Sequence, residues 1–215
     1  MTSISRRGTP PDWAAGEEWT DTVTWKAGDC YDADATIKLM RGNSVVVSCL
    51  GVIGFDNDAL ESGNGDLNVA ALTTAKRAGI NKAVYVSVAS LVEEAFGDKL
   101  LTGYFKGKRT ANALVSDLFK NNGKIVKPSF IYGGDKFELS PPRVPYGYGG
   151  FISKLLSAGP IQAVAEKSPA PLAVVLAPPV NVDDVAKSVV GLALGKVSGT
   201  NVDGTTEIEE AAAAI

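Results

Sequence analysis

The sequence predicts an α/β protein with a parallel sheet. Two short valine-rich runs, Ser44–Leu50 and Ala83–Val88, have the length and composition of strands that are buried on both faces of such a sheet. Helical stretches follow both runs, at 66–79 and between Tyr104 and Phe119, with apolar side chains recurring on one side of each. Alternation of buried strands with such helices is typical of a parallel sheet that helices cover.

The bulk composition narrows the class of protein. A length of 215 residues suits one domain, or one domain with a small annex. A net charge of −3 and the absence of a long basic run argue against a nucleic-acid partner. No stretch reaches the roughly 18 apolar residues of a membrane-spanning helix. The chain has no histidine and only two cysteines, so Ser-His-Asp catalysis is excluded and neither a disulfide framework nor a metal site is expected.

The elements of the first part of the chain follow from its apolar runs and turn residues. In order we expect a strand at 2–6, a loop or weak helical turn at 9–22, a strand at 23–27, a helix at 33–41, a strand at 44–50, a loop rich in Gly, Asn and Asp at 52–65, and a helix at 66–79. Asp29 or Asp32 is expected to cap the helix at 33–41.

Tyr104 and Lys108 stand near the start of the helix that follows the strand at 83–88. A spacing of four residues puts the phenol and the ammonium on one helix face. A nearby cation lowers the pKa of a phenol and readies it for proton transfer, so the pair has a chemical use. The alternative is a solvated polar helix face, and the surrounding sequence favours the first interpretation.

The order of motifs around this pair resembles a known superfamily. A strand ends in Ser87, Tyr104-x-x-x-Lys108 lies on the next helix, and a strand at 124–127 leads into Pro128-Ser-Phe-Ile-Tyr-Gly. This order is similar to that of the short-chain dehydrogenases/reductases, and most of all to their extended and atypical, epimerase/dehydratase-like members. The segment 179–193 resembles a strand-to-helix segment that extended members carry late in the chain. The chain looks especially like chloroplast epimerase-like proteins, in a branch that also holds the accessory subunit of mitochondrial respiratory complex I.

The resemblance implies a Rossmann-type doubly wound parallel sheet with a small irregular C-terminal lobe. Residues 1–134 correspond to the NAD(P)-binding domain, and residues 135–215 to a substrate-side lobe with elements that return to the sheet. Within this lobe we expect irregular structure at 135–150, a short helix near 150–158, and a last strand and alanine-rich helix at 201–215.

The resemblance also implies catalytic roles. Tyr104 would be the proton donor, and Lys108 would lower its pKa and hold the nicotinamide ribose. Ser87 and Ser90 flank the position of the serine that polarises the substrate carbonyl, and Ala89 stands between them. The segment Gly103–Arg109 partly resembles a phosphate-binding P-loop motif. It is expected inside a helix and has the wrong spacing, so we reject phosphate binding there.

The cofactor residues are implied in the same way. Arg6 and Arg7 end the first strand, where the family contacts the adenosine ribose, and guanidinium groups there favour NADP rather than NAD. Asp29 would approach the adenine, and Gly51 and Pro128 would lie beside the cofactor. The alternatives are a basic chain end in solvent for the arginines and a helix cap for Asp29. A further residue, Asn68, either matches a family asparagine or is a solvated helix residue.

The glycine fingerprint G-x-G-x-x-G is found in no strand-to-helix context of the sequence. In the family the strand before it lies in the middle of the sheet, so the strands at 2–6 and 44–50 would flank an unfilled place. We therefore expect the sequence to be incomplete at its N-terminus. We also expect these two strands to lie unpaired, about 9–10 Å apart, which is two inter-strand spacings.

Two functional classes follow from the resemblance. The first is an NADP-dependent oxidoreductase that acts on a small-molecule substrate. The second is a non-catalytic accessory or assembly subunit of an organellar membrane complex, without a membrane-spanning segment of its own. Either would belong in an organelle, a chloroplast in preference to a mitochondrion.

Overall fold

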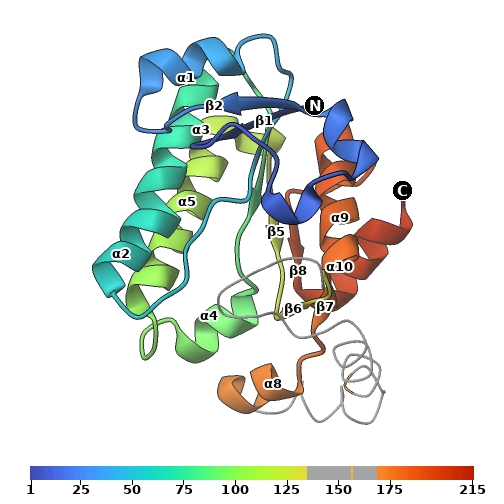
Figure 1. Ribbon diagram of the computed structural model, residues 1–215. Coiled ribbons are helices and arrows are strands. Elements are labelled where there is room, and N and C mark those ends of the chain that lie inside the picture. Colours follow the sequence, from blue (N-terminus) through green and yellow to red (C-terminus); the bar gives the residue numbers. More distant parts are fainter. Residues whose placement is uncertain (135–155, 157–168) are drawn as a thin grey trace.

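The computed structural model describes residues 1–134, 156 and 169–215 and shows helices on both faces of a parallel sheet (Figure 1). The strands are β1 (Thr2–Ser5), β2 (Thr24–Ala27), β3 (Val46–Ser48), β4 (Ala83–Val86), β5 (Gly123–Lys127), β6 (Ile131–Tyr132), β7 (Val180–Asn181) and β8 (Asn201–Asp203). The α-helices are α1 (Ala33–Met40), α2 (Asn57–Glu61), α3 (Leu67–Arg77), α4 (Ser90–Phe96), α5 (Thr102–Phe119), α8 (Ala170–Leu176), α9 (Val182–Leu194) and α10 (Gly204–Ala213). None of these described helices is long and apolar enough to cross a membrane.

The core consists of two layers on either side of the main sheet, whose strand order is β3-β4-β5-β8 with all pairs parallel. Side chains alternate along β4, so that Tyr85 packs against α3 and α5, whereas Val84 packs against α9 and α10. Both side chains are fully buried, as expected for a central strand of a doubly wound sheet. The predicted fold class is therefore confirmed.

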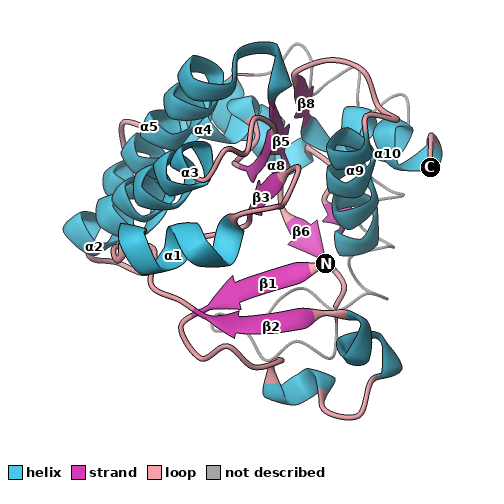
Figure 2. Ribbon diagram, turned by 90° about the horizontal axis from the view of Figure 1, so that it is seen from above, coloured by secondary structure: helices cyan, strands magenta, loops and turns pink. Residues whose placement is uncertain are grey.

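Strands β1 and β2 form a separate two-stranded parallel sheet (Figure 2). Among the described residues, β1 and β3 share no ladder, which confirms that the strands predicted at 2–6 and 44–50 are not directly paired. They are nevertheless close neighbours in the core, because Ile4 of β1 and Val46 of β3 pack against the same cluster of Met40, Ala75 and Ile80. Their separation of about 9–10 Å stays a prediction.

The prediction of a loop at 52–65 is wrong, because most of this segment is helical. Asp56 caps α2 by accepting hydrogen bonds from the backbone N–H groups of Asp58 and Ala59, and a π-helical turn at Ser62–Asp66 joins α2 to α3. Helix-breaking glycines predicted the loop. Here Gly65 is required for close packing, since a Cβ on it would lie 3.0 Å from the Cα of Gly107 on α5.

The C-terminal part follows the prediction where the structure describes it. Strand β7 runs directly into α9, with Asp183 and Asp184 in its first turn, and β8 is followed by the alanine-rich α10. Strand β8 pairs with β5, so the chain returns to the main sheet as expected. The irregular segment at 135–150 and most of the helix near 150–158 lie outside the described residues. Helix α8, which lies in a Pro/Ala-rich stretch, was not predicted.

Candidate functional site

The Tyr104–Lys108 pair lies on α5 beside the carboxyl end of β4. The Nζ of Lys108 donates a hydrogen bond to the carbonyl oxygen of Val86, the last residue of β4, over 3.0 Å. The ring of Tyr104 has its centroid 5.7 Å from the same nitrogen, so the phenol and the ammonium share a helix face as predicted. Ligands of open α/β sheets bind at the carboxyl ends of the strands, and the pair is therefore in the right place for chemistry.

The environment of Tyr104 is apolar. Its side chain packs against a buried cluster that includes Val88 and Ala89 from the turn after β4, and its ring meets Phe105 edge-on at 5.1 Å. This burial raises the pKa of Tyr104 to about 12. The net effect in the protein alone is therefore a raised pKa, caused by burial, and a lowering of the pKa of Tyr104 by Lys108 stays a prediction.

Lys108 is an unusual lysine, since only 5% of its surface is exposed. Burial disfavours its charged form and lowers its pKa to about 8, while the Cys49 thiol, which can become an anion, acts in the opposite direction. A lysine with such a pKa remains mostly protonated at neutral pH and can still release its proton within reach of physiological conditions. Perturbed groups of this kind cluster at functional sites.

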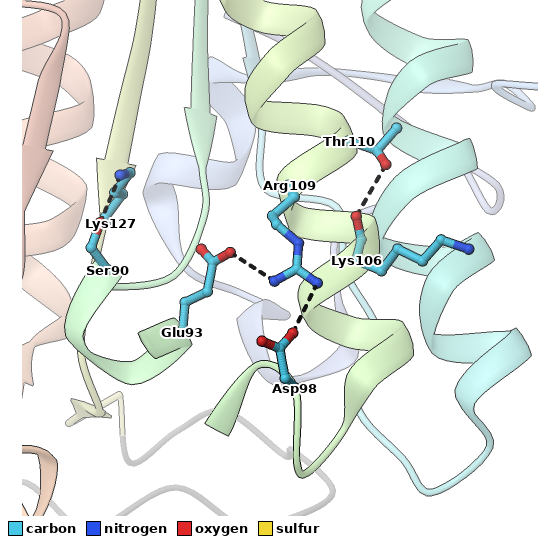
Figure 3. A network of polar contacts seen from close by, with 7 residues as sticks. All are labelled: Ser90, Glu93, Asp98, Lys106, Arg109, Thr110 and Lys127. Atoms are coloured by element: carbon cyan, nitrogen blue, oxygen red, sulfur yellow. Dashed lines mark hydrogen bonds and ion pairs between the residues drawn. The ribbon is translucent and has the colours of Figure 1, made fainter. Parts of the chain in front are cut away.

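The two candidate serines have different surroundings. Ser87 is buried, its backbone N–H donates to the carbonyl oxygen of Val126, and its Oγ has no hydrogen-bond partner. Ser90 begins α4 and donates from both its backbone N–H and its Oγ to the carboxylate of Asp203 on β8, over 3.0 and 2.5 Å. Lys127 completes this contact, because its Nζ lies 2.9 Å from the Ser90 Oγ (Figure 3). The same nitrogen lies 3.3 Å from the Asp203 carboxylate. The hydroxyl of Ser90 is thus tied into a contact between β5, α4 and β8, whereas that of Ser87 is not.

Ion pairs hold α4 against α5 next to the site. Arg109, one residue after Lys108, contacts Glu93 of α4 over 3.1 Å and Asp98 over 3.9 Å (Figure 3). Arg109 and Glu93 are partly exposed and Asp98 is almost fully exposed, and such pairs contribute only about 0–1 kcal/mol each. Arg109 and Asp98 also line a cavity of about 370 Å³ between α2 and the start of α5, and its lining contains neither Tyr104 nor Lys108.

The arginines at the end of β1 lie in a second depression. A groove of about 540 Å³ is lined by Arg6, Arg7 and Trp25 together with Ser5, Thr9 and Pro11. Arg7 reaches Asp12 over 3.4 Å, but both side chains are largely exposed, so the pair leaves the guanidinium accessible. Arginine side chains and an indole in one groove would suit an anionic group attached to a planar ring.

The other predicted cofactor residues lie at strand ends. The carboxylate of Asp29 accepts a hydrogen bond from the backbone N–H of Tyr31, while Asp32 is the residue that caps α1. Pro128 follows β5, and its carbonyl oxygen accepts the backbone N–H of Ala89. Gly51 leaves no room for a side chain, since a Cβ on it would lie 2.9 Å from Asn64 Oδ1 and 3.6 Å from Lys108 Nζ. This close approach fits a backbone that passes directly beside the site.

Sequence reasoning named Asn68 but missed Asn64. Asn64 is buried and bonds the backbone of Val52, and Asn68 accepts a hydrogen bond from Ser48 and donates to Leu50, so both asparagines fix the turn after β3. The solvated alternative for Asn68 is thus wrong. Tyr85 was also missed, although the Lys108 Nζ lies 5.0 Å from its ring centroid. Strand alternation could have found it, because Tyr85 points to the α5 side of the sheet.

The fold is of the Rossmann type, with helices on both faces of a parallel sheet, and the Tyr104–Lys108 pair lies at the carboxyl end of β4. The solved structures that the chain is similar to include the UDP-N-acetylglucosamine 4-epimerase of Methanobrevibacter ruminantium M1 in complex with UDP-N-acetylmuramic acid (TM-score 0.62, 15% identity, covering 95% of this chain and 68% of that one). Another is the UDP-glucuronic acid 4-epimerase of Bacillus cereus in complex with NAD (TM-score 0.58, 18% identity, covering 94% and 68%). At these identities the likeness shows the fold, and it confirms the resemblance to epimerase-like members at that level.

A comparison with curated proteins adds a sequence relative. The chain is 33% identical over 197 residues to an Arabidopsis thaliana protein, "Uncharacterized protein At1g32220, chloroplastic", which covers 88% of this chain. The chain spans 62% of the length of that relative. A scan against protein-family models finds no match.

Proposed function

We propose that this chain carries the proton-transfer site of a nicotinamide-dependent oxidoreductase of the short-chain dehydrogenase/reductase kind. The observation that carries the proposal is the buried Lys108, anchored to the end of β4 with Tyr104 on the same helix face. A bound nicotinamide would supply or accept the hydride. Tyr104 would exchange a proton with the substrate oxygen, and Ser87, whose Oγ lacks a partner, would donate a hydrogen bond to that oxygen.

The residues at the strand ends fit a dinucleotide. Lys108 would hold the nicotinamide ribose, the close turn at Gly51 and the residue Pro128 would lie along the cofactor, and Arg6 and Arg7 would contact a 2′-phosphate. Asp29 would approach the adenine. This arrangement favours NADP over NAD. The solved relative with bound NAD supports a nicotinamide cofactor in general and leaves the choice to experiment.

Titration of the protein with NADPH and with NADH tests the cofactor. Because Trp25 lines the groove with the arginines, energy transfer from tryptophan to bound NADPH gives a direct signal. We expect tighter binding of NADPH, and a loss of this preference in Arg6→Ala/Arg7→Ala by about tenfold or more, as expected for a charge-assisted contact. Arg77→Ala on α3 is the matched control, since Arg77 is half-exposed and pairs with Asp34. Equal affinities for both nucleotides would refute the assignment of the arginines.

The proton donor is tested by Tyr104→Phe, once NADPH oxidation has been found with a carbonyl substrate. The variant keeps the packing of the ring against Phe105 and should lose turnover while its thermal stability stays close to that of the parent. Unchanged turnover would eliminate Tyr104 as the proton donor.

A second function, that of a non-catalytic subunit in an organelle, is favoured by one specific observation, which is that burial raises the pKa of Tyr104 instead of lowering it. Ala89, between Ser87 and Ser90, would then occupy the place of the family serine. Such a subunit would keep the fold to stabilise a larger, membrane-associated assembly. The chloroplastic location of the Arabidopsis relative supports a chloroplast for either function. Isolation from the native source separates the two: the subunit would co-migrate with a large complex, and the enzyme would not require one.

A further inference from the structure

We propose that Tyr85 is a positioning residue of this site, because the face of its ring holds the Lys108 ammonium charged and in place at the end of β4. The Nζ of Lys108 lies 5.0 Å from the Tyr85 ring centroid, nearer than the 5.7 Å to the ring of Tyr104. A cation within about 6 Å of an aromatic centroid is attracted by the negative face of the ring. This attraction grows when the pair is removed from solvent, and here both side chains are buried.

The ring of Tyr85, and not its hydroxyl, is the part that acts. Tyr85 is fully buried between α3 and α5, and its hydroxyl has no hydrogen-bond partner. Phenylalanine would therefore fill the position equally well if packing and ring face were all that mattered. Burial and the nearby Tyr104 raise the pKa of Tyr85, so its phenol stays neutral and offers Lys108 no counter-charge.

Within the part of the chain that the structure describes, four groups face the Lys108 ammonium. The Val86 carbonyl oxygen from β4 accepts its hydrogen bond, and the rings of Tyr85 and Tyr104 lie within cation–π distance. The fourth is the Cys49 thiol from the turn after β3, which favours the charged lysine but itself has a pKa that burial raises. No full negative charge is among these groups at neutral pH, so rings and a carbonyl dipole have to stabilise the cation.

Loss of the ring should therefore shift the protonation of Lys108. A buried cation–π contact corresponds to about one pKa unit, so Tyr85→Leu should lower the pKa of Lys108 from about 8 to about 7. At neutral pH the lysine would then be half-neutral instead of mostly charged. The consequence for turnover rests on the proposed function, but the protonation of Lys108 does not.

Carbon-13 NMR of protein labelled at lysine Cε measures this protonation directly, with the resonance assigned by its loss in Lys108→Arg. Tyr85→Phe should keep the wild-type titration midpoint, and Tyr85→Leu should lower it by about one pH unit. Phe119→Leu is the matched control, because Phe119 is buried in the same cluster and its ring contacts Lys76 instead. Its midpoint for Lys108 should be that of the wild type.

If Tyr85→Leu does not fold, fluorinated phenylalanines at position 85 replace it. They keep the shape of the ring and weaken its negative face stepwise, so the Lys108 midpoint should fall with each added fluorine. A midpoint that is independent of the ring face, in Tyr85→Leu or in the fluorinated series, overturns the proposal. Because no step of this measurement involves a nucleotide or a substrate, that result is distinct from a failure to find NADPH binding or turnover.

Discussion

Replacement of Lys108 by methionine should make the protein more stable. The pKa of Lys108 is lowered from its ordinary value of 10.5 to about 8 by burial, and a tenfold change in a proton equilibrium corresponds to about 1.4 kcal/mol. At neutral pH the charged lysine therefore costs the folded state about 3 kcal/mol relative to the unfolded chain. Methionine has a similar length and no charge. It leaves the Val86 carbonyl oxygen without its donor, which costs about 1–3 kcal/mol, so the expected net gain in the free energy of unfolding is at most about 2 kcal/mol.

The dependence on pH identifies the cause of this gain. Between the folded pKa of about 8 and the unfolded pKa of 10.5, the unfolded chain still holds a proton that the folded protein has released. Wild-type stability therefore rises with pH in this window through Lys108, and the penalty is fully present below it. The raised pKa values of Cys49 and Tyr104 act in the opposite direction, but both groups are present in the variant as well. The difference between the two proteins therefore comes chiefly from Lys108, with a smaller part from Cys49, whose pKa the charge of Lys108 lowers.

Urea unfolding followed by circular dichroism at pH 6.5–9.5 gives the two stability curves. The difference between Lys108→Met and the wild type should be constant at low pH and should shrink as the pH rises past about 8. Lys106→Met is the control, because Lys106 lies on the same helix with 63% of its side chain exposed and should show no gain. A difference in stability that does not change with pH would refute the reasoning, because the stabilisation would then come from packing and not from removal of the buried charge.

Three further predictions concern the same core. Tyr85→Phe removes a buried hydroxyl without a partner and should raise the free energy of unfolding by about 1 kcal/mol in urea titrations, and a loss would mean that the hydroxyl is satisfied in solution. Gly103→Ala places a Cβ 1.9 Å from the Asn57 carbonyl oxygen and should destabilise by about 1–3 kcal/mol or more, whereas Gly54→Ala, with open space around it, should change little. In hydrogen exchange the amides of β4, which pairs on both edges, should be protected more strongly than those of β1, and equal protection would contradict the strand order.

The sequence predicted the strands and the late helices because their patterns are local. Valine runs predicted β3 and β4, and the segment after Pro179 predicted β7 and α9, since a buried strand and a helix start have their own compositions. The predicted ends were too long, as in Ser44–Leu50 against the observed Val46–Ser48. After Ser48 the side chains of Asn64 and Asn68 form hydrogen bonds with backbone groups of Val52 and Leu50, in place of pairing with β4. A strand pattern in the sequence does not show such side-chain hydrogen bonds.

The site was only partly predictable for a similar reason. Spacing alone put Tyr104 and Lys108 on one face, but their protonation depends on burial, which spacing does not give. A nearby cation lowers the pKa of a phenol, yet the apolar cluster around Tyr104 raises it. Likewise Ser90 was a candidate from its place in the chain, and its hydroxyl is bonded to Asp203, which lies 113 residues further on.

The glycines of the rejected phosphate-loop segment fix the position of Tyr104 and Lys108. Gly103 and Gly107 lie one residue before Tyr104 and Lys108, and their face of α5 touches the backbone of the α2–α3 region. A Cβ on Gly107 would lie 2.7 Å from the Gly65 backbone nitrogen. Contact between backbones leaves α5 little freedom to slide or rotate, because no flexible side chain separates the helices. The close packing of Gly103 and Gly107 against the α2–α3 region therefore positions Tyr104 and Lys108 at the end of β4. The same seven residues, Gly103–Arg109, contain both the packing glycines and the pair.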